Sequence, residues 1–191
     1  MSGNKYEAIV VGTSAGGFFA VTSILGNLPP DFSIPVIVVQ HRAKESHTLL
    51  EEVLQRKCRI AVRQADEKER IESATVYIAP PDYHLLIETD RTFSLSSDAP
   101  VQFSRPSIDV LFETAALTYK DKLIGIILTG SNSDGAAGIS AIRRMGGLTV
   151  AQDPKEAQYA LMTQASIDTN DVQHIWRLQE IGDFLQSLTH K

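Results

Sequence analysis

AIVVGTSAGG, residues 8–17, joins an apolar run to a turn rich in glycine. Tyr6 to Val11 is short and rich in isoleucine and valine, which predicts a buried strand that ends at this turn. Gly17 to Leu28 has apolar residues at the spacing of one helical face. A second apolar run, Ile34 to Val39, predicts another buried strand. Strand, helix and strand in this order indicate a parallel βαβ unit and an α/β fold.

The rest of the chain continues this alternation, except in the middle. Three short strands separated by turn residues predict local hairpins there, an antiparallel insertion at a sheet edge. The later elements that we expect are a helix from Ser46 to Leu54, strands at Val76–Ala79, Tyr83–Glu88 and Thr92–Leu95, a helix at Ser107–Tyr119, a strand at Leu123–Leu128, a helix ending at Met145, a strand at Leu148–Ala151 and a closing helix at Ile175–Leu188.

Composition limits the class of protein. A length of 191 residues with 43% hydrophobic content predicts one domain spanning residues 1–191. A net charge of −5 without a basic stripe argues against nucleic-acid binding. No apolar stretch approaches the roughly 20 residues of a membrane span, so we expect no membrane insertion. The N-terminus does not resemble a signal peptide and Cys58 is the single cysteine, which together predict a cytoplasmic protein.

The glycine turn allows two interpretations: it binds a phosphate group, or it exposes a serine as a nucleophile. A dinucleotide site requires glycine at position 14 and usually an acidic residue after the next strand, whereas the chain has Ser14 there and Gln40-His41 after that strand. We therefore expect no cofactor. Gly12 to Gly16 instead matches GxSxG, a strand-to-helix turn that exposes a serine. This motif alone leaves open whether Ser14 is a nucleophile or a helix cap.

A nucleophilic serine needs a base and an orienting acid, and both are available at strand exits. His41 and Asp134 each follow an apolar run, so they are predicted to lie at the same edge of the sheet as Ser14. Asp153 is an alternative acid, and Asp134 could instead cap the helix that follows it. Cys58 is interpreted as a packed small residue in preference to a catalytic thiol. No metal-ligand spacing is present, so no metal is expected.

Six segments in order resemble the catalytic domain of the CheB-type chemotaxis protein-glutamate methylesterases: GTSAGG, VVQH, YIAPPDYHL, RPSIDVLF, LTGSNSDGAAG and AQDPKEAQYALM. The resemblance runs from about residue 8 to about residue 167. It implies a doubly wound, mainly parallel sheet of three layers, and a serine hydrolase that demethylates glutamate side chains of chemoreceptors. It places the nucleophile at Ser14, the base at His41 and the acid at Asp134, in agreement with the residues chosen from strand positions.

The same resemblance extends to further positions in the site. It implies an oxyanion site formed by the backbone of Ala15 and of the acid loop, here at Ser131. We expect substrate contacts at Thr13, Arg42 and Arg105, with Lys44 a weaker candidate.

The chain departs from the family pattern in several places. Ala43 and Thr163 stand where proline is frequent, and Ser131 and Asn132 stand where methionine and glycine are usual. The phosphorylatable receiver domain that usually precedes the esterase domain is not seen before the first predicted strand. This predicts a free-standing esterase, with a separate receiver or methyltransferase as a potential partner, or one piece of a larger polypeptide.

Three functions are compatible with these residues and motifs. The leading one is demethylation of the cytoplasmic helices of a methyl-accepting chemoreceptor with release of methanol, with deamidation of receptor glutamine by the same chemistry. A small-molecule carboxylesterase would use the same residues. An inactive module that binds receptor or methyltransferase is the third.

Overall fold

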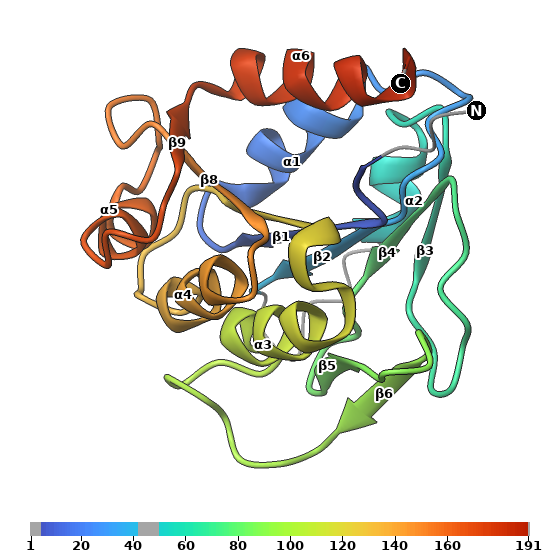
Figure 1. Cartoon of the computed structure of the whole chain (residues 1–191), viewed down its shortest axis with the longest axis horizontal. Coiled ribbons are helices and arrows are strands. Elements are labelled where there is room, and N and C mark those ends of the chain that lie inside the picture. Colours follow the sequence, from blue (N-terminus) through green and yellow to red (C-terminus); the bar gives the residue numbers. More distant parts are fainter. Residues whose placement is uncertain (1–4, 42–49, 191) are drawn as a thin grey trace.

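The computed structural model describes residues 5–41 and 50–190 and contains a seven-stranded sheet in which all neighbouring strands run parallel (Figure 1). The strand order is β3-β4-β2-β1-β7-β8-β9. Because β2, β4 and β3 lie on one side of β1 and β7, β8 and β9 lie on the other, the sheet is doubly wound and confirms the predicted α/β class. The strands are β1 (Ala8–Thr13), β2 (Val36–Gln40), β3 (Ala61–Gln64), β4 (Thr75–Ile78), β7 (Leu123–Ile127), β8 (Leu148–Gln152) and β9 (His174–Trp176).

Helices cover both faces of this sheet (Figure 1). One face is covered by α1 (Gly17–Leu25), α2 (Leu50–Gln55) and α6 (Leu178–Ser187). The other is covered by α3 (Ile108–Tyr119), α4 (Ala136–Arg144) and α5 (Leu161–Ile167). Short 3-10 turns, η1 (Lys120–Lys122) and η2 (Leu188–His190), follow α3 and α6. Among the described residues, no helix combines the length and apolar character that a membrane span requires.

The apolar runs of the sequence are explained by burial on both faces. In β1, Ile9 and Val11 join the core on the side of α1, whereas Ala8 and Val10 join the core on the side of α3. All four side chains are fully buried. A strand covered from both sides needs apolar residues at every position, and this is why the run does not alternate with polar residues.

The hairpin prediction is correct in part. β5 (His84–Ile87) and β6 (Phe93–Ser96) form an antiparallel two-stranded sheet of their own, beside α3. The Ile87 amide donates to the Thr114 hydroxyl of that helix at 3.1 Å. The predicted strand at Val76–Ala79, however, is not part of a hairpin. It corresponds to β4, which lies inside the main sheet because its residues are buried and pair in parallel with β2 and β3.

Several predicted boundaries shift for local reasons. β1 continues through Gly12 and Thr13, whose partners lie in β2. β2 begins at Val36 because Pro35 has no N–H to donate to the ladder. The first helix ends at Leu25, and the following residues form a turn in which the Leu28 amide donates to the Leu25 carbonyl. The predicted start of the second helix at Ser46 lies outside the described residues.

The C-terminal prediction requires correction. Ile175 does not open a helix: it lies in β9 and pairs with Ala151 of β8. The closing helix α6 begins at Leu178, where the Glu180 side chain accepts a hydrogen bond from the Arg177 amide at 2.8 Å. The short helix α5 and the edge strands β3 and β9 were not among the predicted elements.

Candidate active site

Ser14 lies immediately after β1, at the edge of the sheet formed by the carboxyl ends of the strands. Its amide donates to the Thr129 carbonyl at 3.0 Å, and its carbonyl accepts from the Gly17 amide that opens α1. Gly16 has a φ of 78°, and a Cβ there would approach the Gln158 side-chain oxygen to 2.7 Å. Glycine is therefore required at this position, and the turn holds Ser14 at the N-terminus of a helix.

His41 lies at the end of the neighbouring strand. It follows β2, and its amide donates to the Thr13 carbonyl at 3.0 Å, so Ser14 and His41 leave the sheet from adjacent, hydrogen-bonded strands. The imidazole is largely buried, with 12% of the side chain exposed. Within the described part of the chain, the Ser14 hydroxyl makes no hydrogen bond to His41. Catalytic hydrogen bonds are often long or poorly aligned before substrate binds, so the geometry alone does not exclude His41 as the base.

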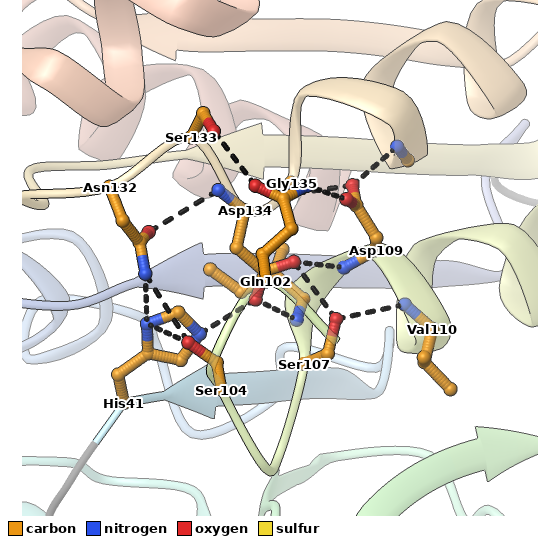
Figure 2. Close-up of polar contacts among 12 residues, drawn as sticks. His41, Gln102, Ser104, Ser107, Asp109, Val110, Asn132, Ser133, Asp134 and Gly135 are labelled. Atoms are coloured by element: carbon orange, nitrogen blue, oxygen red, sulfur yellow. Dashed lines mark hydrogen bonds and ion pairs between the residues drawn. The ribbon is translucent and has the colours of Figure 1, made fainter. Parts of the chain in front are cut away.

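Asp134 lies in the loop after β7 and is fully buried. Its Oδ2 accepts from His41 Nε2 at 2.7 Å and from the Ile108 amide at 2.7 Å (Figure 2). Its Oδ1 accepts from the Ser107 hydroxyl at 2.9 Å and from the Asp109 amide at 3.0 Å. Burial opposes ionisation of Asp134, but the hydrogen bonds from His41 and from the two amides outweigh it and lower the pKa of the carboxyl. The charged form is therefore favoured next to the imidazole.

These donors show that Asp134 caps a helix other than the one that follows it. The Ile108 and Asp109 amides belong to the first turn of α3, whereas the residue at the start of α4 is Gly135, which has no side-chain cap. The carboxylate of Asp109 in turn accepts from the Gly135 and Gly138 amides at 2.9 and 2.7 Å. The two helices thus exchange acidic caps, and this exchange fixes Asp134 against His41.

Asp109 is the second buried carboxyl of the site. Burial, with a further contribution from the charge of Asp134, raises the pKa of Asp109 to about 6, although the two glycine amides oppose this shift. Its Oδ2 accepts a hydrogen bond from the side-chain Nε2 of Gln102 at 2.8 Å. The Ser133 hydroxyl donates to the side-chain Oε1 of Gln102 at 2.7 Å. A polar network therefore connects α3 with the loop before it and with the loop between β7 and α4.

The other ring nitrogen of His41 faces two residues that were not predicted from the sequence as site residues. Asn132 Nδ2 lies 3.4 Å from His41 Nδ1, and Ser104 Oγ lies 3.5 Å from it (Figure 2). Asn132 Nδ2 also donates to Ser104 Oγ at 3.3 Å. Because Nε2 is bound to Asp134, Nδ1 is the ring nitrogen whose lone pair remains to accept a proton.

Ser104 is held by a tight turn. Val101 and Ser104 exchange two backbone hydrogen bonds, at 3.1 and 2.8 Å, around Gln102 and Phe103. These two residues have φ values of 46° and 63°, in the left-handed region that ordinary residues rarely adopt. The Gln102 side chain, bound to Asp109, braces the turn. Phe103, at the tip of this turn, is fully exposed.

The backbone amides of Ala15 and Ser131 are the ones predicted to form an oxyanion site. Among the described residues, the amides of Ala15 and Ser131 donate no hydrogen bond, whereas the Gly130 amide donates to the Tyr159 carbonyl. Ala15 adjoins Ser14 at the N-terminus of α1, and Ser131 belongs to the loop that also carries Asp134. A backbone N–H without a protein acceptor is suited to bind an anionic oxygen, and the oxyanion site at Ala15 and Ser131 stays a prediction.

The remaining predicted site residues lie away from this centre or act structurally. Thr13 is fully buried and its hydroxyl donates to the Thr129 carbonyl at 2.8 Å, so it ties β1 to β7. The Arg105 guanidinium pairs with Asp82 and donates to the carbonyls of Ser97 and Asp98, which favours a role in bracing the loop. Arg42, and likewise Lys44 and Ala43, lie outside the described residues.

Asp153, the alternative acid, and Cys58, the alternative nucleophile, have other surroundings. The Asp153 carboxylate accepts from the Lys155 amide at 2.9 Å in a turn after β8, and it is Asp134 that binds His41. Cys58 is buried in the core, and burial raises the pKa of its thiol to about 11. A thiolate nucleophile is therefore disfavoured there, in agreement with the prediction of a packed residue.

The residues that sequence reasoning missed surround the ones it found. Ser107 and Asp109 lie at a predicted helix start, and a serine and an acid there are a sign of capping. That sign does not reveal that the caps are exchanged between two helices. Asn132 was noted only as a departure from a family pattern. Ser104 has no recognisable local signal.

Comparison with known proteins gives a consistent result. The model of the family described as CheB methylesterase matches residues 9–185. A relative from Leptospira interrogans, called a putative protein-glutamate methylesterase/protein-glutamine glutaminase, is 52% identical over 94% of this chain and 93% of its own length. A protein-glutamate methylesterase/protein-glutamine glutaminase from Anaeromyxobacter dehalogenans is 36% identical over 97% of this chain, which spans 54% of that relative.

A solved structure is similar along nearly its whole length. The crystal structure of the Thermotoga maritima CheB methylesterase catalytic domain superposes with a TM-score of 0.91 at 30% identity, covering 98% of this chain and 100% of that one. The agreement therefore includes the sheet, the helices on both faces and the separate hairpin.

Proposed function

Since this chain belongs to the CheB methylesterase family, we propose that it is a protein-glutamate methylesterase in which Ser14 is the nucleophile, His41 the base and Asp134 the acid. One observation carries the assignment of residues: a buried carboxylate lies 2.7 Å from an imidazole whose strand is hydrogen-bonded to the strand that ends at the serine. Carboxylate, imidazole and hydroxyl in this order are the groups that acyl transfer requires.

In the first step, the Ser14 hydroxyl oxygen attacks the γ-carbonyl carbon of a glutamyl methyl ester. The proton of the hydroxyl passes to His41 Nδ1, and Asp134 stabilises the positive charge that forms on the ring. The carbonyl π electrons move to oxygen, and this oxyanion is bound by the amides of Ala15 and Ser131. The ring nitrogens exchange the roles they have in the chymotrypsin template, because here Nε2 faces the acid.

Collapse of the tetrahedral intermediate breaks the bond to the methoxy group. His41 returns its proton to the leaving oxygen, which departs as methanol, and Ser14 remains acylated. Water, deprotonated by His41, then attacks the acyl-enzyme and releases the glutamate carboxylate and the serine hydroxyl. A glutamine side chain would follow the same route with ammonia as the leaving group, and the glutaminase activity in the names of the relatives favours this second reaction.

The surroundings of the site support a protein substrate. Phe103 is fully exposed at the turn next to Ser104, Phe19 is 72% exposed in the first turns of α1, and Tyr159 is 45% exposed beside Gly130. Large apolar side chains exposed near a reactive centre are typical of protein-binding surfaces. We propose that the substrate is a methylated side chain of a cytoplasmic chemoreceptor helix, which places the reaction in the cytoplasm.

The test is methanol release from a chemoreceptor fragment carrying radiolabelled glutamyl methyl esters. We expect Ser14→Ala to reduce turnover by at least about 10⁴-fold, as removal of a triad nucleophile does elsewhere. Ser23→Ala is the matched control, because this serine lies on the same helix and, among the described contacts, its hydroxyl binds only the Phe19 carbonyl. Equal release by wild type and Ser14→Ala would refute the assigned nucleophile.

The same assay separates the alternative functions. Turnover of simple esters such as p-nitrophenyl acetate without turnover of the receptor would indicate a small-molecule carboxylesterase. Receptor binding with no turnover of either substrate would indicate an inactive binding module.

A further inference from the structure

We infer that Asn132 is a positioning residue for His41, which fixes the ring nitrogen on the side away from Asp134 as a hydrogen-bond acceptor before substrate binds. The inference rests on the proposed role of His41 as base. It concerns a residue whose side chain does not take part in the bond changes proposed above.

The orientation of the Asn132 side chain is fixed by the backbone. Asn132 Oδ1 accepts from the Asp134 amide at 3.3 Å, and a backbone N–H can only donate. The oxygen therefore faces Asp134, and the amide nitrogen faces His41 and Ser104, at 3.4 and 3.3 Å. The assignment of nitrogen and oxygen in the amide thus follows from its hydrogen bonds.

The protonation of the ring follows from its two sides. The ionised Asp134 carboxylate can only accept a hydrogen bond from His41 Nε2, so Nε2 carries a hydrogen. Asn132 Nδ2 donates toward Nδ1, so a proton on Nδ1 would place two donors against each other. The hydroxyl of Ser104, which accepts from Asn132, has its own hydrogen free to point at the same nitrogen. Asn132 therefore favours the neutral ring with the Nδ1 lone pair available.

Asn132 also contacts the ring nitrogen to which the Ser14 hydroxyl has to hydrogen-bond. Nδ1 is occupied by protein donors in the resting structure, so the Ser14 hydroxyl replaces them when it hydrogen-bonds to the base. Both contacts are long, 3.4 and 3.5 Å, and long hydrogen bonds are weak. The charged group that the described residues place against the ring is Asp134, with Asp109 behind it. The asparagine therefore adjusts the base without adding a charge.

The pH dependence of kcat/KM tests this role. Removal of the donor in Asn132→Ala should move the acid limb of the profile to higher pH by about half to one unit, with a plateau changed less than about tenfold. Asn132→Asp keeps the shape and the acceptor for the Asp134 amide but turns a donor into a charged acceptor, so the acid limb should move further in the same direction. A residue that only supports the fold would lower the plateau without this ordered shift.

Ser133→Asp is the matched control for charge. It adds the same charge one residue along the loop, where the side chain binds Gln102 and not His41, so its shift should be smaller than that of Asn132→Asp. Acid limbs of Asn132→Ala and Asn132→Asp that coincide with that of wild type would overturn the inference.

A second measurement does not need turnover. In the Ser14→Ala background, nitrogen NMR of the His41 ring should show the hydrogen on Nε2 and a hydrogen-bond-accepting Nδ1 when Asn132 is present. The Nδ1 chemical shift should change when Asn132→Ala removes the donor, and change further when Asn132→Asp replaces it with a charged acceptor. An Nδ1 chemical shift that is the same in all three proteins would overturn the inference. Failure of the proposed function has a different signature, which is retained methanol release in Ser14→Ala.

Discussion

Asp134 serves two purposes with one carboxylate, because it binds the His41 ring and also accepts the amides that open α3. Asp134→Asn should therefore lower kcat by about 10⁴-fold, since an amide cannot hold the imidazole in the same tautomer. It should also reduce the free energy of unfolding by about 1–3 kcal/mol, because the amide nitrogen would face backbone donors. Steady-state turnover and chemical denaturation measure the two effects.

The control for this change is Asp153→Asn, the other acid at a strand exit. Its carboxylate binds only the Lys155 amide of its own turn among the described contacts, so turnover should stay within about twofold of wild type. If Asp153→Asn lost activity and Asp134→Asn did not, the acid would be misassigned.

At the residue scale, sequence reasoning could place Ser14, His41 and Asp134 at one edge of the sheet, because the carboxyl ends of parallel strands meet there whatever path the loops take. It could not find Asn132 or Ser104. Their contacts with His41 Nδ1 depend on the path of two loops and on the strained turn at Gln102 and Phe103, which no local pattern of residues predicts.

At the scale of elements, the exchange of caps between α3 and α4 links helix stability to pH through Asp109. Its pKa is raised to about 6, mainly by burial, above the value of about 3.9 in an unfolded chain. The folded protein therefore binds the Asp109 proton more tightly, and this group makes the fold less stable as pH rises from about 4 to 6. An uncharged side chain at position 109 should therefore remove this loss of stability with rising pH.

Asp109→Asn tests this expectation. Its oxygen can still accept the Gly135 and Gly138 amides, and Gln102 can turn its side-chain oxygen toward the new amide. Relative to wild type, the free energy of unfolding of the variant should increase on the order of 1–3 kcal/mol between pH 4 and pH 7. Denaturation at several pH values measures it, with the exposed Asp183→Asn as control. A difference that stays constant or falls with pH would contradict the assignment.

The elements themselves were predictable where they are long and buried, and not where they are short or at an edge. β1, β2 and β7 read as strands because both faces are covered. β9 has three residues, and Ile175 is half exposed, so its pairing with β8 is determined by tertiary contacts. The Val76–Ala79 run was correctly read as a strand, but its partners β2 and β3 lie too far along the chain for a local reading to assign.

At the scale of the whole molecule, the two apolar cores share the same strands. In β2, Val36 and Val38 belong to the core under α1, whereas Ile37 and Val39 belong to the core under α3. Neither core can lose its packing without exposing strands that the other core needs. The prediction of one domain over residues 1–191 therefore implies a single cooperative unfolding transition.

Calorimetry on wild type, Ile9→Ala and Val10→Ala tests this, because these neighbours in β1 point into opposite cores. Truncation of a buried isoleucine costs about 2–5 kcal/mol, and each kcal/mol shifts Tm by about 2–4 °C in a chain of this size. Each variant should lower the Tm of the whole transition, with the calorimetric enthalpy equal to the van't Hoff enthalpy. Two separate transitions, each sensitive to only one substitution, would show that the two faces unfold independently and that the sheet does not couple them.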